Sequence, residues 1–262
     1  MKLLYGKVVA EKIYQEIKAE IKLKKIKPAM AVILVGNLAA SLSFIKAKEK
    51  ISKDLGIGFK LYHFLEIVTE REVLNLITVL NKNSNINGII VQLPLPENIK
   101  TESIIKAIDP GKDIDGLLGE ILTPSAAAVL GILKFYEISL KNKKIVLVGH
   151  GRLVGQPLNK QLIKIGNAPI ICDKNTPDLS QETLKADILI SATGVPGLIK
   201  PDMVKNSVAI VDAGTAEADG QITGDVDKAT YEKVFAVSPV PGGVGPLTVA
   251  YLMKNLVNAA TY

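Results

Sequence analysis

The sequence contains very little cysteine and histidine. Its 262 residues include one cysteine, Cys172, and two histidines, His63 and His150. A single cysteine excludes a disulfide within the chain and fits a reducing compartment, so we expect a cytoplasmic protein in which Cys172 is a small core residue. With so few histidine and cysteine ligands we find no cluster with metal-binding spacing, and we expect no metal site.

Long apolar runs and a strong charge of one sign are missing too. No apolar run approaches the roughly 18 residues that a membrane-spanning helix needs, and the N-terminus carries charges too frequent for a signal peptide. The net charge is +6, from 32 basic and 26 acidic residues spread over both halves. We therefore expect neither a membrane nor a nucleic-acid partner. The mild surplus suits a small anionic ligand, although solvated surface lysines explain most of it.

The most informative stretch is residues 144–155, where an apolar run ends in a glycine-rich turn. The run is typical of a central strand in a parallel sheet. Gly149 permits a tight turn, and Gly151 leaves room for a pyrophosphate at the N-terminus of the following helix. The third glycine is Gly155, so the spacing is GxGxxxG rather than GxGxxG. An ordinary strand-to-helix turn therefore stays open as the alternative at this point.

The residues after this turn support a nucleotide-binding domain. Short apolar runs at 169–172, 187–191 and 208–212 alternate with helical or turn segments, which is the pattern of βαβ units. Asp173 and Lys174 end the first of these runs, where the ribose of a dinucleotide would lie.

The first half of the chain predicts an α/β unit of its own. We expect helices at 9–23, 39–55 and 70–81 and strands at 30–36, 59–64 and 88–92. A linking helix should run from Pro124, capped by Thr123, to about residue 136. Near the end, a segment rich in proline and glycine at 238–246 precedes an apolar helix at 247–258. We interpret this segment as a shaped ligand wall, with a plain flexible loop as the alternative.

Three groups in the first half could carry chemistry. Phe44 and Lys48 share one face of a helix, Gln92 ends a predicted strand, and Asp115 follows in the sequence Lys-Asp-Ile-Asp-Gly at 112–116. The pattern alone favours a solvated lysine at 48 and allows a turn aspartate at 115.

Together these pieces resemble the bifunctional methylenetetrahydrofolate dehydrogenase/cyclohydrolase family. The resemblance covers nearly the whole chain and is most specific at residues 88–96, 112–116, 153–157 and 239–248. It implies oxidation of 5,10-methylenetetrahydrofolate by NADP, followed by hydrolysis of the methenyl product to 10-formyltetrahydrofolate. It also implies a homodimer and a two-domain α/β fold, in which a cleft separates a catalytic domain from a Rossmann-type domain. We expect the catalytic domain at 1–122, with the last helix (246–262) docking back onto it, and the Rossmann domain at 123–245.

The resemblance also implies residue roles. Lys48 matches a catalytic lysine, Gln92 the glutamine that hydrogen-bonds it, and Asp115 a carboxylate that accepts from the pterin; these are our catalytic residues. The remaining expected folate contacts are Phe44, Val91, Leu93, Pro241, Gly242, Gly243 and Gly245. The expected cofactor contacts are Gly149, His150, Gly151, Arg152, Val154, Gly155, Asp173, Lys174, Thr193, Gly194 and Thr215.

Two departures and a question of cofactor remain. Phe44 stands where the family usually has tyrosine, so no hydroxyl can assist Lys48, and the segment between Asp115 and Thr123 is shorter than usual. Asp173 would favour the 2′-hydroxyl of NAD. The family and the positive groups at His150, Arg152 and Lys174 favour NADP.

Alternatives of other classes are a non-catalytic folate- or nucleotide-binding homologue and a two-domain small-substrate enzyme resembling shikimate dehydrogenase. Joint retention of Lys48, Gln92 and Asp115 argues against the first. The motifs Gln-Leu-Pro-Leu-Pro and Pro-Gly-Gly-Val-Gly argue against the second.

Overall fold

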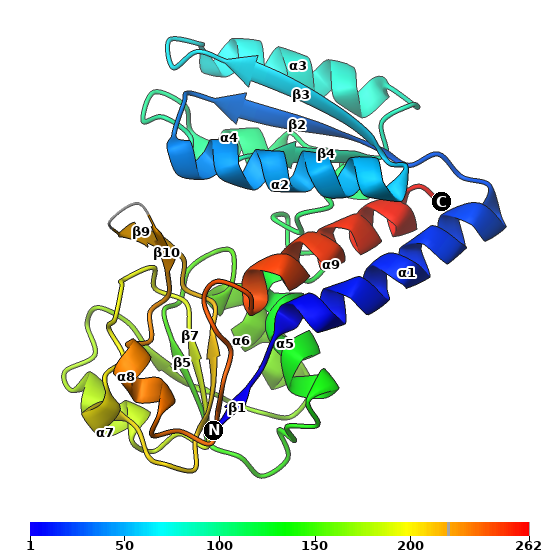
Figure 1. Cartoon of the computed structure of the whole chain (residues 1–262). Coiled ribbons are helices and arrows are strands. Elements are labelled where there is room, and N and C mark those ends of the chain that lie inside the picture. The colour runs from blue at the N-terminus through cyan, green and yellow to red at the C-terminus, as the bar shows by residue number, and fades with distance from the viewer. Residues whose placement is uncertain (219–220, 262) are drawn as a thin grey trace. The chain divides into compact units, whose positions relative to one another are not determined.

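A computed structural model describes residues 1–218 and 221–261. The chain divides into two compact units (Figure 1). One comprises residues 13–121 and 252–262 and contains a three-stranded sheet; we call it the three-stranded unit. The other comprises residues 1–12 and 122–251 and contains a six-stranded sheet; we call it the six-stranded unit. All pairings within both sheets are parallel, so the predicted two-domain α/β fold is confirmed.

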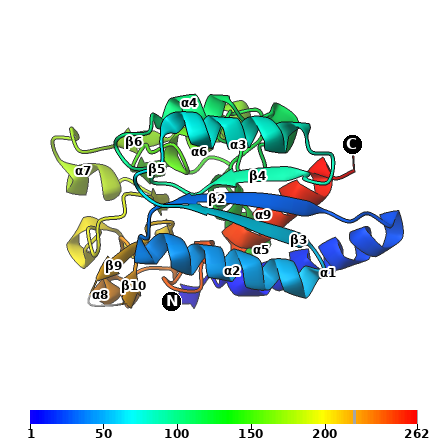
Figure 2. The same cartoon turned by 90° about the horizontal axis from the view of Figure 1, so that it is seen from above.

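The three-stranded unit has the strand order β3-β2-β4. Its elements are β2 (Ala29–Val35), α2 (Ala39–Leu55), β3 (Gly58–Phe64), α3 (Glu70–Lys82), β4 (Gly88–Val91), α4 (Thr101–Lys106) and the short η1 (Pro110–Lys112). The central strand β2 is apolar throughout because helices cover both faces of the sheet. Figure 2 shows α2 on one face and α3 with α4 on the other.

Local sequence explains where these helices begin and end. The side chain of Thr69 accepts from the backbone N–H of Glu72, and the Glu72 side chain accepts from Thr69, so a capping box starts α3. Helix α2 ends at Gly56, whose φ of 71° is a conformation that glycine adopts without strain. Both helices have the bounds expected from the sequence to within one residue.

The six-stranded unit has the strand order β1-β11-β8-β7-β5-β6. Its strands are β1 (Lys2–Leu3), β5 (Ile145–Val148), β6 (Ile170–Cys172), β7 (Ile188–Ser191), β8 (Ala209–Asp212) and β11 (Ala236–Val237), and the strands β9 (Ala216–Ala218) and β10 (Gln221–Thr223) form a separate antiparallel ribbon. After β5 the chain adds β6 on one side of that strand and then crosses to the other side to add β7. The order of the strands therefore switches between β5 and β7. Ligands of open α/β sheets bind beside such a point, at the carboxyl ends of the strands.

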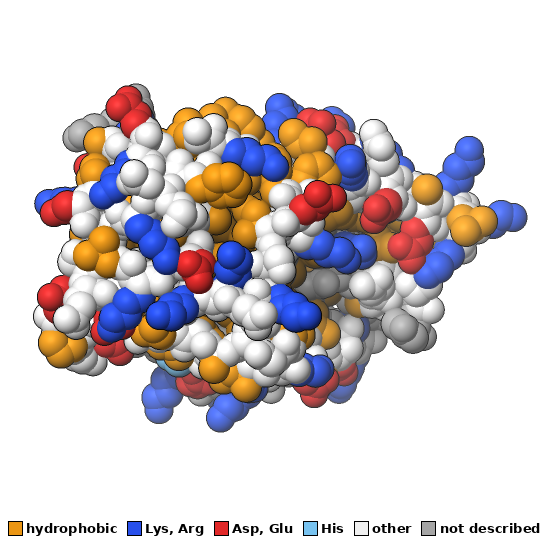
Figure 3. All heavy atoms as spheres, turned by 90° about the horizontal axis from the view of Figure 1, so that it is seen from below, with side chains coloured by type: hydrophobic (Ala, Val, Ile, Leu, Met, Phe, Trp, Pro, Cys, Tyr) orange, Lys and Arg blue, Asp and Glu red, His pale blue; other side chains and the backbone are white. Residues whose placement is uncertain are grey.

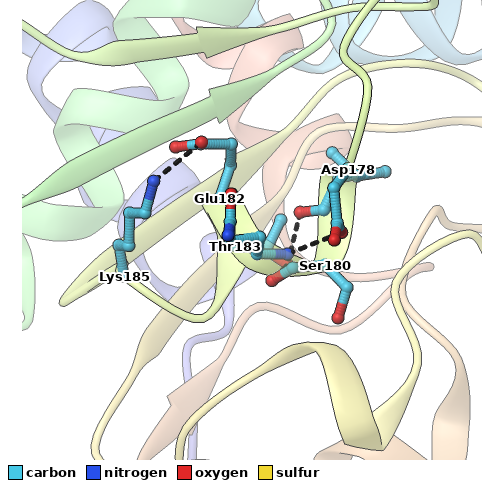
Figure 4. Close-up of polar contacts among 7 residues, drawn as sticks. Asp178, Ser180, Glu182, Thr183 and Lys185 are labelled. Atoms are coloured by element: carbon cyan, nitrogen blue, oxygen red, sulfur yellow. Dashed lines mark hydrogen bonds and ion pairs between the residues drawn. The ribbon is translucent and has the colours of Figure 1, made fainter.

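Helices cover both faces of this sheet. They are α5 (Pro124–Phe135), α6 (Gly155–Lys164), α7 (Leu179–Thr183) and α8 (Lys228–Tyr231), together with the short η2 (Pro201–Met203). Side chains of α7, η2 and α8 pack on one face, and Figure 1 shows α5 and α6 on the opposite side. Cys172 is buried in this core, as predicted. Asp178 caps α7 by accepting from Gln181, and Glu182 pairs with Lys185 at its end (Figure 4).

Residues 1–12 do not group with the rest of the expected domain at 1–122. Strand β1 pairs with β11, so residues 1–12 belong to the six-stranded unit. Helices α1 (Gly6–Lys24) and α9 (Val244–Ala259) each contribute residues to both units. Within the three-stranded unit, Asn255 of α9 donates to the carbonyl of Ile114 at 3.0 Å. Tyr262, the last residue of the expected docking segment, lies outside the described residues.

Two global properties concern possible partners. Among the residues that the structure describes, no helix combines the length and apolar character that a membrane crossing requires. On the face shown in Figure 3, basic and acidic side chains are interspersed and do not gather into one patch.

Candidate functional site

Lys48 makes a hydrogen bond to another expected catalytic residue in the three-stranded unit. It lies on α2, and its Nζ donates to Oε1 of Gln92 at 2.9 Å. Phe44 lies four residues earlier on the same helix, a spacing that places both side chains on one helical face, and it is 39% exposed. The predicted contact between Lys48 and Gln92 is therefore present.

Gln92 is held at the carboxyl end of β4. Its backbone N–H donates to the carbonyl of Ile33 at 2.9 Å, which extends the sheet pairing by one residue. Its Nε2 donates to the carbonyl of Leu93 at 3.1 Å. This second bond fixes the amide so that its oxygen faces Lys48. Of the neighbouring residues expected at the site, Val91 is buried and Leu93 is half-buried.

Asp115 reaches the same place from the loop after η1. A β-bridge between Ile89 and Asp113 ties this loop to β4. Asp113 is buried, and its Oδ2 accepts from the backbone of Leu118 at 2.7 Å, so it holds the short segment that follows Asp115. Asp113 Oδ1 has no partner among the described residues. No separate role for Asp113 was predicted, because a turn aspartate and a loop anchor look alike in a single sequence.

Burial and charge act in opposite directions on Lys48 and Asp115. Burial lowers the pKa of Lys48, and the negative charge of Asp115 partly opposes that shift. Burial raises the pKa of Asp115, the charge of Lys48 lowers it, and Asp113 raises it further. Both groups are thus displaced toward their neutral forms. A lysine whose pKa is lowered is more readily present as the neutral amine that can accept a proton, and the negative charge of Asp115 stabilises the ammonium that forms.

In the six-stranded unit, the glycines after β5 form a turn that side chains would block. Gly149 has a φ of 96°, and a Cβ there would lie 2.5 Å from the carbonyl oxygen of Ala192. A Cβ at Gly155, the first residue of α6, would collide with the carbonyl oxygen of Gly149. A Cβ at Gly151 would meet nothing within 4 Å. This combination fits a dinucleotide: two glycines allow the turn and the helix contact, and the third leaves an open approach to the backbone.

Other expected cofactor contacts lie at the same edge of this sheet. Asp173 follows β6, Gly194 follows β7 and Thr215 follows β8. Strands β6 and β7 each pair in parallel with β5, and β8 pairs in parallel with β7. A Cβ at Gly149 would lie 3.1 Å from Cγ2 of Thr193, and one at Gly194 would lie 3.7 Å from the carbonyl oxygen of Thr215. The structure therefore brings the loops after β5, β7 and β8 together.

The groups expected near the cofactor ribose are accessible. Oδ1 of Asp173 accepts from the backbone of Asn175 at 2.8 Å in a tight turn. Asp173, Lys174 and His150 are exposed, whereas Arg152 and Val154 are half-buried.

The glycines before α9 lie in the six-stranded unit. The carbonyl of Gly242, whose φ is 112°, accepts from the backbone of Gly6 at 3.0 Å and of Lys7 at 3.3 Å. Gly243 donates to the carbonyl of Pro239 at 2.7 Å. These bonds define the shape of the segment, as expected for a wall rather than a flexible loop. Pro241 and Gly245 are exposed.

Sequence reasoning missed a pair of buried carboxyl groups in the six-stranded unit. Asp212 ends β8 and Asp225 follows β10, and both are fully buried. Burial raises the pKa of Asp212 to about 7, against the hydrogen bond from Val226 and with help from the charge of Asp225. The available signal was an aspartate within two residues of a glycine in the sequences Val-Asp-Ala-Gly and Gly-Asp-Val-Asp. That signal does not distinguish a buried carboxyl group from an ordinary turn.

Known proteins resemble the chain over its full length. The bifunctional protein FolD of Nautilia profundicola is 41% identical over 276 aligned positions, which cover 99% of this chain and 97% of that protein. A crystal structure of the FolD methylenetetrahydrofolate dehydrogenase/cyclohydrolase from Campylobacter jejuni superimposes with a TM-score of 0.95 at 38% identity, covering 100% and 99% of the two chains. The Trypanosoma brucei dehydrogenase-cyclohydrolase, solved with NADP and an inhibitor, superimposes with a TM-score of 0.94 at 28% identity, covering 99% and 97%.

Likeness to the rival enzyme class is weaker. Shikimate 5-dehydrogenase from Thermus thermophilus is 16% identical, with a TM-score of 0.57 over 88% of this chain and 98% of that one. This similarity concerns the fold alone.

Two family models account for most of the sequence. The catalytic-domain model of tetrahydrofolate dehydrogenase/cyclohydrolase matches residues 4–115, and the NAD(P)-binding-domain model of the same family matches residues 123–262. With the glycine turn in one unit and the lysine–glutamine contact in the other, these matches lead to one conclusion. The chain belongs to the tetrahydrofolate dehydrogenase/cyclohydrolase family.

Proposed function

We propose that this chain oxidises 5,10-methylenetetrahydrofolate with NADP and hydrolyses the methenyl product to 10-formyltetrahydrofolate. The hydrogen bond between Lys48 and Gln92, beside Asp115, carries the proposal because it provides a lysine prepared for proton transfer. A folate-binding homologue without catalytic activity would have no need of a lysine whose pKa is lowered.

Lys48 would act as the base of the hydrolytic step. Its neutral amine takes a proton from water while the oxygen attacks the methenyl carbon, and then delivers that proton to the ring nitrogen as the carbon–nitrogen bond breaks. The hydroxyl of the intermediate loses its remaining proton to solvent as the formyl C=O forms, so the hydrolysis of the methenyl cation releases one proton overall. Gln92 accepts one N–H of the amine and so orients its lone pair. The charge of Asp115 stabilises the ammonium between the two transfers.

Asp115 would also bind the substrate. An ionised carboxylate accepts two hydrogen bonds side by side and so matches the amino and ring N–H groups of a pterin. Phe44 would stack on the pterin from the same face of α2 as Lys48, without the hydroxyl that a tyrosine would bring.

The six-stranded unit would hold the cofactor. NADP, when bound, accepts the hydride, and the protein positions the reacting atoms. The open approach at Gly151 and the N-terminus of α6 suit the pyrophosphate. The loops after β7 and β8 would face the nicotinamide with Thr193, Gly194 and Thr215.

The choice of NADP rests on positive charge near the ribose and on the relative solved with NADP. Lys174, His150 and Arg152 could each attract a 2′-phosphate, whereas Asp173 would repel it. If Lys174 is the phosphate partner, Lys174→Ala should raise the KM for NADP more than the KM for NAD. A lower KM for NAD than for NADP in the unmodified enzyme would overturn the NADP assignment.

Three further assignments belong to the same proposal. We place folate binding and catalysis in residues 1–122 together with the last helix, and cofactor binding in 123–245; the two family matches support a boundary near 120. The family resemblance supports a homodimer, which light scattering on the purified protein would test. The lone cysteine supports a cytoplasmic location.

One assay separates the alternatives. Purified protein with methylenetetrahydrofolate and NADP should produce the absorbance of NADPH and then lose the absorbance of the methenyl intermediate. A non-catalytic homologue would produce neither change. A shikimate dehydrogenase-like enzyme would reduce NADP only with a hydroxy acid.

A further inference from the structure

Asp212 and Asp225 hold together segments that lie far apart in the sequence. Oδ2 of Asp225 accepts from the Ser191 hydroxyl and from the backbone N–H of Thr193, both at 2.7 Å. Oδ1 of Asp212 accepts from the backbone of Gly214 at 2.9 Å, and its Oδ2 accepts from Val226 at 2.9 Å. One pair of side chains thus fixes the backbone after β7, after β8 and after β10.

The backbone around the two carboxyl groups is closely packed against them. The ribbon of β9 and β10 pairs Ala216 with Thr223 and so returns the chain to the end of β8. A Cβ on Gly214 would collide with the carboxyl group of Asp225, and a Cβ on Gly224 would collide with that of Asp212. Each carboxyl group therefore occupies the space that a side chain at the facing glycine would need.

The bonds made by the pair reach the expected cofactor contacts directly. Thr193, whose N–H binds Asp225, is itself an expected contact and precedes Gly194. Gly214, whose N–H binds Asp212, precedes Thr215. Burial protects these hydrogen bonds from competition by water. Neither carboxyl group has a role in the chemistry proposed above.

We propose that Asp225 and Asp212 are positioning residues for the dinucleotide, which set the loops after β7 and β8 where the nicotinamide end must bind. This proposal rests on the dehydrogenase function proposed above. It makes cofactor binding depend on two groups that the cofactor need not touch. Hydrolysis by Lys48, which lies in the three-stranded unit, should not depend on them.

The test compares two substitutions at Asp225. Asp225→Ala removes the acceptor of Ser191 and Thr193, and we expect the KM for NADP to rise at least about tenfold, equivalent to about 1.4 kcal/mol. Asp225→Asn keeps an oxygen in that place, and we expect a KM within about threefold of the unmodified enzyme. Cyclohydrolase activity, measured on methenyltetrahydrofolate without NADP, should stay within about twofold in both.

The matched control is Asp227→Ala, which removes a half-buried carboxylate that caps α8 two residues away, and it should leave the KM for NADP unchanged. If Asp225→Ala does not fold, Ser191→Ala removes one of the two donors, and a twofold to fivefold rise in KM is expected.

An unchanged KM in Asp225→Ala, or in Ser191→Ala where the first variant is insoluble, would overturn the proposal. So would a parallel loss of both activities, since that marks a merely structural role. Failure of the unmodified enzyme to reduce NADP would instead overturn the proposed function, and this inference with it.

Discussion

At the scale of single residues, the chemistry depends on the opposed shifts of Lys48 and Asp115. Burial disfavours both charges, while each charge stabilises the other. The amine must be neutral to take a proton from water, so the hydrolytic rate should rise with pH and level off above the pKa of Lys48. That inflection should lie below the value of about 10.4 for a free lysine.

Asp115→Asn tests this coupling. Because the charge of Asp115 raises the pKa of Lys48, its removal should move the inflection in cyclohydrolase kcat to lower pH. The measurement is kcat against pH at saturating methenyltetrahydrofolate. Asp109→Asn, on an exposed carboxylate six residues earlier, should leave the inflection in place. A shift to higher pH in Asp115→Asn would show that the pair is not coupled in this way.

Sequence and resemblance together led to the contact between Lys48 and Gln92, but periodicity alone favoured a solvated lysine. Other lysines surround Lys48 in the sequence, and only the tertiary fold decides which of them is buried. The buried pair of Asp212 and Asp225 escaped prediction for the same reason. The carboxyl groups approach each other only because the β9–β10 ribbon closes on β8.

At the scale of elements, the sequence predicted the strands and helices that have strong periodicity or clear end signals. Helix α2 ends at its glycine and α5 begins after Thr123, whose hydroxyl accepts from Ala126. Strand β1 was missed because two residues carry no periodic signal, and its pairing with β11 is decided by tertiary contacts.

The glycine turn after β5 allows a prediction about one element. Gly151→Ala places a methyl group in open space, so the melting temperature should change little while the KM for NADP rises. Gly155→Ala forces a collision with the carbonyl of Gly149 and should lower the melting temperature as well. The measurements are thermal unfolding and KM for each variant. A wild-type KM in Gly151→Ala would mean that the phosphates lie elsewhere.

At the scale of the whole molecule, the buried Asp212 links stability to pH. Its pKa is about 7 in the folded protein and about 3.9 when unfolded. Below the unfolded value the carboxyl group is protonated in both states and its contribution is fully present. The contribution is lost as the pH rises through about 7, because the folded state must then hold the ionised carboxylate of Asp212 in a buried place. Asp225 and Tyr231 are titratable neighbours of this group.

Asp212→Asn removes this titration. The variant loses an acceptor and should be less stable at pH 5, but its deficit should shrink by on the order of 2 kcal/mol between pH 5 and pH 8. Chemical unfolding of both proteins at the two pH values measures the difference, with Asp227→Asn, at a half-buried carboxylate, as the control. A deficit that stays constant with pH would refute the raised pKa.

The most direct test of the whole account is Lys48→Met, assayed for both activities on one purified preparation. Methionine is similar in length but carries no proton, so cyclohydrolase activity should fall by about 10²–10⁴-fold. Dehydrogenase activity should fall less, through poorer positioning of the folate, and NADP binding should be unchanged. Lys50→Met, on the exposed side of the same helix, serves as the control. Full cyclohydrolase activity in Lys48→Met would contradict the account and remove this lysine from the mechanism.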